Sequence, residues 1–169
     1  MSVARLRVVK ARSPFTRARV PALFGQVDFQ GALVVDVGAG YGAKAEYAVR
    51  RGARCAVLID VDVDVLRGRG GPHFDSVAAD AHMLPLRGCS ADVVVFWNVL
   101  QFLQDEDKAL GEVARVSRRY VLLSVYKTAR GRWYTWGQFL ELANRLGKPV
   151  YTRRGGTQYQ AVVSRAASE

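Results

Sequence analysis

The chain has 169 residues, enough for one domain with a sizeable core and too few for two domains of ordinary size. It has no apolar run of membrane-spanning length and no charged-then-apolar leader, so we expect a soluble, cytoplasmic protein without a membrane partner. Two isolated cysteines and two histidines match neither a disulfide framework nor a metal-ligand spacing, so we expect no metal site.

The formal net charge of +10 lies at the two ends of the chain. Residues 1–20 contain six Lys and Arg and no acidic residue, and residues 115–169 contain eleven basic and two acidic residues. The stretch between them has eight basic and thirteen acidic residues. A solvated surface laced with ion pairs, as in a thermophile, needs both signs of charge. Because the ends have so few acidic residues, we favour a polyanionic partner for them.

The first predicted elements form a corner that suits a nucleotide-like ligand. A short helix is expected over residues 14–24, and the apolar, mostly β-branched run at 33–37 predicts a strand buried on both faces. A glycine-rich turn at 38–42 leads from this strand into a helical pattern that ends near Arg51. Glycines let the main chain approach a ligand, and the free N–H groups of a helix start favour a polar or anionic group there.

Two classes of ligand fit this corner. The spacing Gly38-x-Gly40-x-x-Ala43 matches the dinucleotide fingerprint, and Asp60 follows about 20 residues on to hold a ribose. Asp36 favours the other class, because its carboxylate would repel a pyrophosphate and attract the ammonium group of an amino-acid-bearing cofactor.

The spacing Asp36-x-Gly38-x-Gly40-x-Gly42 resembles the first motif of the class I S-adenosylmethionine-dependent methyltransferases, with a core of the quinone-biosynthesis type. The resemblance covers roughly residues 31–164. It implies an α/β, doubly wound fold with a mostly parallel seven-stranded sheet, an antiparallel strand in the C-terminal hairpin and helices on both faces. It also implies S-adenosyl-L-methionine as the cofactor, held near Asp36 and the backbone of Gly38, Ala39 and Gly40.

The second buried strand is predicted over residues 55–59, with Asp60 at its end and a helix start at 62–66. In the resembling family this acidic residue accepts hydrogen bonds from both ribose hydroxyls. The next side chain, here Val61, packs on the adenine face.

A third strand is predicted over residues 73–79, before the segment Asp80-Ala81-His82-Met83-Leu84-Pro85. This segment is similar to the family's Asp-Ala-x-x-Leu-Pro pattern. The resemblance implies that Asp80 contacts the adenine amino group and that the backbone N–H of Ala81 contacts a ring nitrogen.

Residues 91–97 predict the fourth strand, and the candidate catalytic residues lie at its end. In the resembling family the reacting groups meet beyond the carboxyl ends of strands one, four and five, which puts Phe96 beside the cofactor. Asn98 and Gln101 are the polar side chains best placed to orient a methyl acceptor. Trp97 can stack on a flat acceptor, or it can be a packing residue.

The last part of the chain predicts a helix capped by Asp105 or Asp107, a strand over 120–125, a basic loop over 127–131, a helix that ends at Gly147 and a closing hairpin over 150–164. An aromatic cluster lies between the basic loop and that helix. Aromatic residues interleaved with basic ones suit phosphate contact and base stacking. The cluster and its basic neighbours are Trp133, Tyr134 and Trp136 with Lys127, Arg130 and Arg132.

We therefore expect RNA, a transfer or ribosomal RNA, as the methyl acceptor, bound through the basic arm at 1–20 and through residues 115–165. Residues 1–20 are expected to form that arm and the start of a lid helix, and residues 21–169 a single domain. A small-molecule acceptor of the quinone-biosynthesis type, a protein lysine, and a non-catalytic module of the same fold stay open. The segment at 96–99 lacks the motif of adenine amine methylation, and no cysteine stands where cytosine C5 transfer needs one.

Overall fold

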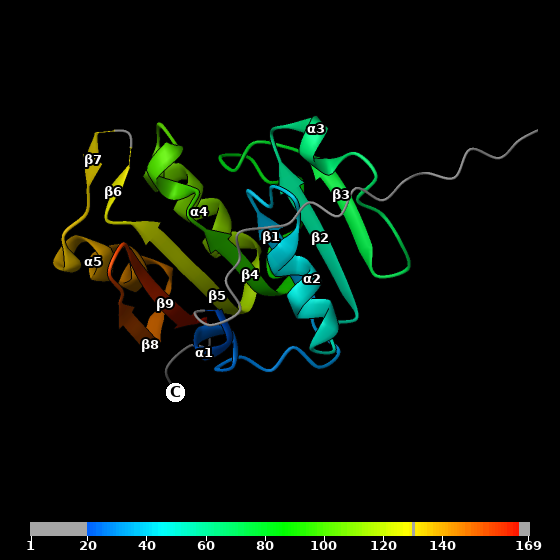
Figure 1. Ribbon diagram of the computed structural model, residues 1–169, viewed down its shortest axis with the longest axis horizontal. Helices are drawn as coiled ribbons and strands as arrows, with labels where there is room; N and C mark the ends of the chain where they lie inside the picture. Colours follow the sequence, from blue (N-terminus) through cyan, green and yellow to red (C-terminus); the bar gives the residue numbers. More distant parts are fainter. Residues whose placement is uncertain (1–19, 130, 166–169) are drawn as a thin grey trace, which may run out of the picture.

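The computed structural model describes residues 20–129 and 131–165, so the arm expected at residues 1–19 and the side chain of Arg130 lie outside the described residues. One sheet of seven strands, in the order β3-β2-β1-β4-β5-β9-β8, runs through the middle of the molecule (Figure 1). All neighbouring pairs are parallel except those that β9 makes, which confirms the predicted fold class. The strands are β1 Leu33–Val37, β2 Cys55–Asp60, β3 Phe74–Ala78, β4 Ala91–Trp97, β5 Ser117–Tyr126, β8 Lys148–Arg154 and β9 Gln158–Ser164.

Helices cover both faces of the sheet. A hydrophobic core lies between the sheet and the helices on each face. One core holds the buried side chains of α4 and α5, and the other holds those of α1, α2 and α3. The central strand β4 is buried along its whole length, as expected of a parallel strand with helices on both sides. The helices are α1 Val20–Phe24, α2 Ala43–Arg50, α3 Val63–Leu66, α4 Glu106–Val116 and α5 Trp136–Leu146, with a short 3-10 helix, η1, at Leu100–Phe102.

Polar side chains cap the starts of three helices, and one of these caps was predicted from the sequence. Asp62 caps α3, and Asp105, one of the two predicted candidates, caps α4 by accepting a hydrogen bond from the N–H of Lys108 at 2.9 Å. Thr135 and Gln138 form a reciprocal capping box at the start of α5. These caps set the helices against the sheet and hold the loops at the carboxyl ends of the strands in place.

The segment predicted as a basic loop at 127–131 differs from the prediction. Its residues Thr128–Ala129 form β6, which pairs antiparallel with β7 Arg132–Trp133 just after the segment. The two strands make a small hairpin that lies apart from the main sheet (Figure 1). The fifth strand is also longer than predicted, because the chain passes from α4 into β5 at Ser117 without a loop. No helix in the described ranges is both long and apolar enough to span a membrane.

The topology creates a crevice at one edge of the sheet. From β1 the chain proceeds to β2 and β3 on one side, and from β4 it proceeds to β5 on the other, so the strand order reverses between β1 and β4. In doubly wound folds, ligands bind outside the carboxyl ends of the strands at this switch point. The glycine turn after β1 and the segment after β4 both lie there.

Candidate cofactor pocket

The turn between β1 and α2 uses its glycines for two different purposes. A Cβ atom on Gly38 would lie 2.2 Å from Cγ2 of Val99, so this glycine lets two loops pack closely. Gly40 has a φ of +51° and nothing within 4 Å of a Cβ built on it. Gly40 therefore faces open space in a conformation that other residues rarely adopt, which is where a ligand can approach the main chain.

Asp60, at the end of β2, is held by two backbone donors. Its Oδ2 accepts a hydrogen bond from the N–H of Gly40 at 2.8 Å, and its Oδ1 accepts one from the N–H of Asp62 at 3.0 Å. A carboxylate has about four acceptor positions, so both oxygens keep capacity for further donors. A pair of vicinal hydroxyls, such as those of a ribose, matches this carboxylate.

A cavity of about 360 Å³ lies beside Asp60 and brings together the carboxyl ends of β1, β2, β3 and β4. Apolar side chains stand at its mouth: Val61 is 71% exposed and Phe102 is 48% exposed. A flat ring entering between such side chains would remove apolar surface from water. The lining residues are Val37, Gly38, Asp60, Val61, Ala79, Asp80, Ala81, Asn98, Val99, Phe102 and Leu103.

Asp80 presents a fixed carboxylate to this cavity. Its Oδ1 accepts two hydrogen bonds from His82, one from the backbone N–H at 2.8 Å and one from Nδ1 at 2.6 Å. The backbone hydrogen bond is the largest of the effects that lower the pKa of Asp80, with the side chain of His82 adding to it. Asp80 is therefore an ionised acceptor, which matches an exocyclic amino group.

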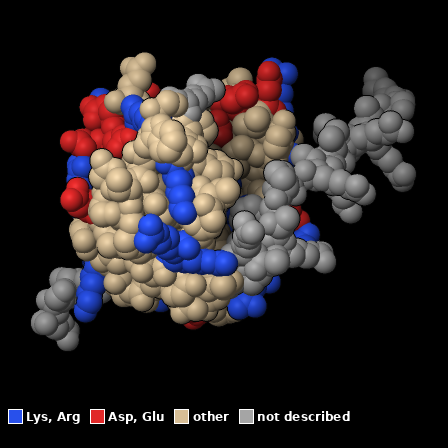
Figure 2. Space-filling model, turned by 60° about the vertical axis from the view of Figure 1, so that its left-hand side comes forward, with Lys and Arg blue, Asp and Glu red and all other residues tan. Residues whose placement is uncertain are grey.

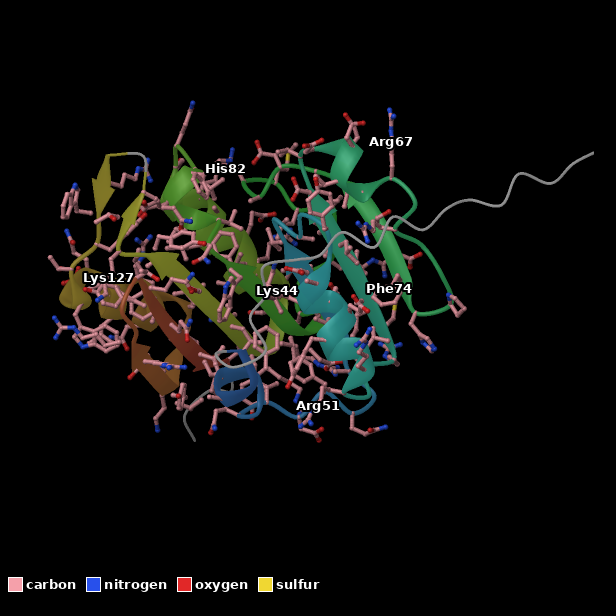
Figure 3. All side chains as sticks on the ribbon, in the orientation of Figure 1. Lys44, Arg51, Arg67, Phe74, His82 and Lys127 are labelled. Atoms are coloured by element: carbon pink, nitrogen blue, oxygen red, sulfur yellow. The ribbon has the colours of Figure 1, made fainter. Side chains whose placement is uncertain are left out.

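Asp36 lies next to the cavity but does not line it. Strand alternation puts Asp36 on the α2 side of the sheet, where it is fully buried, and Nζ of Lys44 from α2 lies 3.8 Å from its Oδ2 (Lys44 is labelled in Figure 3). Burial raises the pKa of Asp36 to about 6, although the charge of Lys44 opposes the rise. Lys44 is the cation beside Asp36, and a hydrogen bond from the backbone N–H of Ala45 also acts to lower the pKa of this carboxyl.

Asn98 is the predicted catalytic residue that the structure brings to the cavity. Its φ of +57° turns the chain out of the sheet directly after β4. The hydroxyl of Ser124 donates a hydrogen bond to Oδ1 of Asn98 at 3.0 Å, and the N–H of Asn98 donates one to the carbonyl of Ser124 at 2.8 Å. With Oδ1 engaged, the Nδ2 group of Asn98 is free to act as the donor toward a bound molecule.

Six residues predicted for the site do not line the cavity: Asp36, Ala39, Gly40, Phe96, Trp97 and Gln101. Phe96 and Trp97 belong to the fully buried strand β4, so their side chains enter the two cores; the ring of Trp97 lies 5.6 Å from that of Phe24. Gln101 is 2% exposed, and its Nε2 donates a hydrogen bond to the carbonyl of Asn98 at 2.7 Å. Trp97 is thus a packing residue, the second of the two predicted possibilities, and Gln101 supports the turn rather than facing a ligand.

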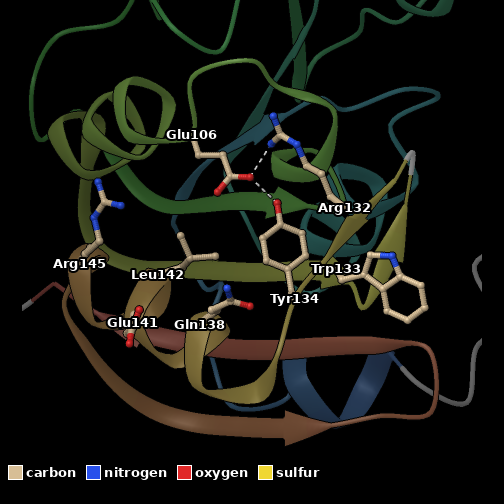
Figure 4. A pocket seen from close by; sticks show the side chains of 8 residues that line it. All are labelled: Glu106, Arg132, Trp133, Tyr134, Gln138, Glu141, Leu142 and Arg145. Carbon is tan, nitrogen blue, oxygen red and sulfur yellow. Dashed lines mark hydrogen bonds and ion pairs between the residues drawn. The ribbon is translucent and has the colours of Figure 1, made fainter.

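The aromatic cluster is also divided by the structure. Arg132 and the hydroxyl of Tyr134 both donate to Oε1 of Glu106, each at 2.5 Å (Figure 4). Desolvation, with the hydrogen bond to Glu106, raises the pKa of Tyr134 to about 12. Trp136 packs on Phe139, with ring centroids 5.5 Å apart, whereas Trp133 is 77% exposed and points away from the others (Figure 4). Of the three rings, only that of Trp133 is largely open to a stacking partner.

Several functional positions were not predicted from the sequence. The apolar wall formed by Val99, Phe102 and Leu103 follows β4, in a segment from which only polar residues were singled out. The side chains of Ser124 and His82 act through Asn98 and Asp80, and a local pattern does not show such pairings. The one available signal was the run of apolar residues beyond the end of a buried strand, which suits a ring-binding wall.

The adenosine part of S-adenosylmethionine fits the groups present. Asp60 is an acceptor that suits the ribose hydroxyls and Asp80 one that suits the adenine amino group, whereas Asp36 is fully buried and does not line the cavity. The open backbone at Gly40 leaves room for the amino-acid chain of the cofactor. The carboxylates of Asp60 and Asp80 are hydrogen-bond acceptors of the kind that an adenosine needs.

Comparison with solved structures shows the same fold. An S-adenosylmethionine-dependent methyltransferase from Mesorhizobium loti has a TM-score of 0.73 and 16% identity, with 85% of this chain and 96% of that chain covered. The 1,6-didemethyltoxoflavin-N1-methyltransferase of Burkholderia thailandensis, solved with S-adenosylhomocysteine, has a TM-score of 0.69 and 20% identity, with 85% and 74% covered.

Sequence comparison gives the family. The demethylmenaquinone methyltransferase of Thermobifida fusca (strain YX) is 36% identical over 97 residues, which are 53% of this chain and 41% of that protein. The chain thus spans less than half the length of this relative. The methyltransferase domain family matches residues 35–124, from β1 to β5. The chain therefore belongs to the methyltransferase domain family, and its cofactor is S-adenosylmethionine.

Proposed function

We propose that the protein transfers the methyl group of S-adenosylmethionine to a nucleophile that enters beside Asn98. The observation that carries this proposal is the cavity at the switch point, where Asp60, Asp80 and Asn98 meet. The cofactor supplies a methyl group on a sulfonium, and the transfer is a direct displacement. The protein has to hold the acceptor in line with the methyl group and exclude water, which supplies much of the rate.

The lining of the cavity limits how the acceptor is activated. Of the described residues that line it, only Asp60 and Asp80 have ionisable side chains, and both suit the adenosine. Asn98 can orient an acceptor by donating a hydrogen bond, but an amide takes up no proton. The acceptor group is therefore one that is nucleophilic as bound, or one that loses its proton to solvent.

RNA is the proposed acceptor. The ends of the chain supply most of the positive charge, and β8 carries Lys148, Arg153 and Arg154 in a stretch, 148–165, without an acidic residue. Figure 2, in which the left-hand side of Figure 1 is turned forward, shows Lys and Arg side chains gathered near the centre of that face. Trp133 adds an exposed ring for base stacking. These features support a polyanion with unpaired bases.

A small ring compound is the second candidate, and two observations favour it. The Thermobifida fusca relative is a demethylmenaquinone methyltransferase. The lining of the cavity includes Val99, Phe102 and Leu103, apolar side chains that suit an apolar ring. In this case the basic ends would be a solvated surface.

One labelling experiment distinguishes the acceptors. Tritiated S-adenosylmethionine is incubated with the protein and, in parallel, with total RNA, total protein and a metabolite extract. Label in RNA is the expected result, and label confined to the metabolite extract would put the second candidate first. Label confined to protein would indicate a side chain such as lysine as acceptor, and label in none of the three would contradict methyl transfer.

Two variants test the roles of the residues in the labelling reaction. Asn98→Ala is expected to lower turnover more than it lowers the affinity for S-adenosylhomocysteine, because Asn98 orients the acceptor. Asp64→Ala is the control, since Asp64 pairs with Arg67 on the surface of α3, away from the lining of the cavity. Equal turnover of Asn98→Ala and wild type would move the acceptor site to another part of the crevice.

A further inference from the structure

Asp80 and His82 are joined by two hydrogen bonds that reach the same oxygen. The backbone N–H and the Nδ1 of His82 converge on the same carboxylate oxygen, Oδ1, at 2.8 and 2.6 Å. A carboxylate only accepts, so Nδ1 carries the hydrogen. Among the described residues, none donates a hydrogen bond to Oδ2, the second oxygen of Asp80.

The burial of His82 indicates that its ring is held in place against the carboxylate of Asp80. The side chain of His82 is 18% exposed, and its Nε2 is buried without a hydrogen-bond partner among the described residues. Burying an unpaired ring nitrogen has a cost in free energy. His82 stands near the start of α4 (Figure 3). Within the described part of the chain, the single hydrogen bond of this ring goes to the carboxylate of Asp80.

The consequence for ligand recognition follows from the two oxygens. With both donors of His82 on Oδ1, rotation about the Cβ–Cγ bond of Asp80 is restricted and Oδ2 stays directed away from His82. Oδ2 is then a fixed acceptor that meets a donor on the ligand. An adenine has an exocyclic amino group to donate, whereas a hypoxanthine presents a carbonyl oxygen that the carboxylate would repel.

We infer that His82 is a positioning residue that makes the pocket selective for adenine over hypoxanthine, by fixing the carboxylate of Asp80. This inference rests on the proposed function, because it takes the cavity to be the adenosine site. It assigns to His82 a part in specificity and none in the transfer itself.

The test is the ratio of two dissociation constants measured by calorimetry. S-adenosylhomocysteine is compared with S-inosylhomocysteine, in which a carbonyl replaces the 6-amino group and N1 carries a hydrogen, on wild type, His82→Ala and Asp80→Ala. We expect Asp80→Ala to reduce the preference for the adenine ligand by about 10- to 100-fold, the range for a hydrogen bond to a charged group. His82→Ala is expected to reduce it by about 3- to 10-fold, with little change for the inosine ligand.

Three further variants make the result specific. His82→Asn, whose side-chain amide can replace the Nδ1–H donor, should restore part of the preference. The double variant Asp80→Ala/His82→Ala should lose no more than Asp80→Ala, because His82 acts through that carboxylate. His73→Ala is the matched control: Nδ1 of His73 lies 3.0 Å from the carbonyl of Arg54, and this residue does not line the cavity.

Some outcomes contradict the inference about His82 alone, and another contradicts the proposed function as well. If His82→Ala weakens both ligands equally, or neither, His82 does not position Asp80 and the inference is wrong, while the cofactor assignment stands. If His82→Ala does not fold, His82→Asn and its ratio decide instead. If wild type binds neither ligand, the proposed function fails and the inference fails with it.

Discussion

At the scale of single residues, the roles of Gly38 and Gly40 in the glycine turn can be distinguished by experiment. Gly38 is a packing position and Gly40 a ligand position, although both stand in one motif. A methyl group on Gly38 meets Val99 at 2.2 Å, whereas one on Gly40 meets nothing within 4 Å. A substitution at Gly38 is therefore expected to lower stability, and a substitution at Gly40 to lower ligand binding.

We expect Gly38→Ala to destabilise the fold by about 1–3 kcal/mol, because overpacking forces Val99 to move and because φ is +67°. Adding Val99→Ala should recover part of that loss by removing the methyl groups in contact. Denaturant unfolding of the two single variants and of the double variant measures the coupling. Strictly additive effects would show that the contact with Val99 does not cause the defect.

Asp36 makes the stability of the fold depend on pH, in a direction that follows from its raised pKa. Its pKa is raised from 3.8 to about 6 in the folded state, so the folded state binds the proton more tightly than the unfolded chain does. The stability contributed by the protonated form is present below about pH 4 and is lost as the pH rises through 6.

Asp36→Asn is therefore expected to be more stable than wild type at pH 8, by roughly 1–3 kcal/mol, and about equal to it at pH 4. Thermal unfolding of both proteins across this range measures the difference. A variant less stable than wild type at pH 8 would mean that the ion pair with Lys44 outweighs the cost of burying the charge.

The sequence predicted the charged residues of the pocket better than its other residues. Asp60 and Asp80 are short side chains at strand ends, and the backbone that follows each one fixes them locally. Phe96 and Gln101 could not be placed from the sequence, because their directions depend on where the chain leaves the sheet. That point is Asn98, whose positive φ no pattern predicted.

At the scale of elements, buried strands and capped helices were predicted closely, and the connection after β5 was not. The predicted strand at 55–59 differs from β2 by its final residue, because apolar runs between turn signals define such strands. The hairpin of β6 and β7 has two residues in each strand and no alternating pattern. Its shape instead depends on long-range contacts, such as those of Arg132 and Tyr134 with Glu106.

The hairpin separates two tryptophans that the sequence grouped together. Trp133→Ala is expected to change stability by less than about 0.5 kcal/mol and to weaken RNA binding by about 1–3 kcal/mol, because the exposed ring can stack. Trp136→Ala should cost roughly 2–4 kcal/mol of stability, since Trp136 packs on Phe139 and Tyr159. Thermal unfolding and filter binding measure both. Equal RNA affinity of Trp133→Ala and wild type would remove this ring from the RNA site.

At the scale of the whole molecule, most basic residues lie outside the stretch of sequence that supplies the carboxylates of the cofactor site. The first 20 residues and the stretch after 115 are basic, while the region that supplies Asp36, Asp60 and Asp80 has more acidic than basic residues. A cofactor that carries an ammonium and a sulfonium group suits the acidic region. The proposed partner of the basic ends is the phosphate backbone of RNA.

RNA binding by the ends predicts a steep dependence on salt. Deleting residues 1–12 removes Arg5, Arg7, Lys10 and Arg12, and should flatten the slope of log affinity against log salt by about two to four. Affinity for S-adenosylhomocysteine should stay unchanged. Filter binding of transfer RNA at several salt concentrations measures the slope. If the wild-type protein shows no salt-dependent binding, the charge is a solvated surface and the small ring compound becomes the favoured acceptor.

The most direct test of the account is calorimetry of the wild-type protein with S-adenosylhomocysteine and with a nicotinamide dinucleotide. We predict a dissociation constant on the order of micromolar for S-adenosylhomocysteine and no measurable heat for the dinucleotide. Asp60→Ala should weaken the first by about 1–3 kcal/mol through lost ribose hydrogen bonds, and Asp64→Ala should leave it unchanged. Tight binding of the dinucleotide without any heat from S-adenosylhomocysteine would contradict the account.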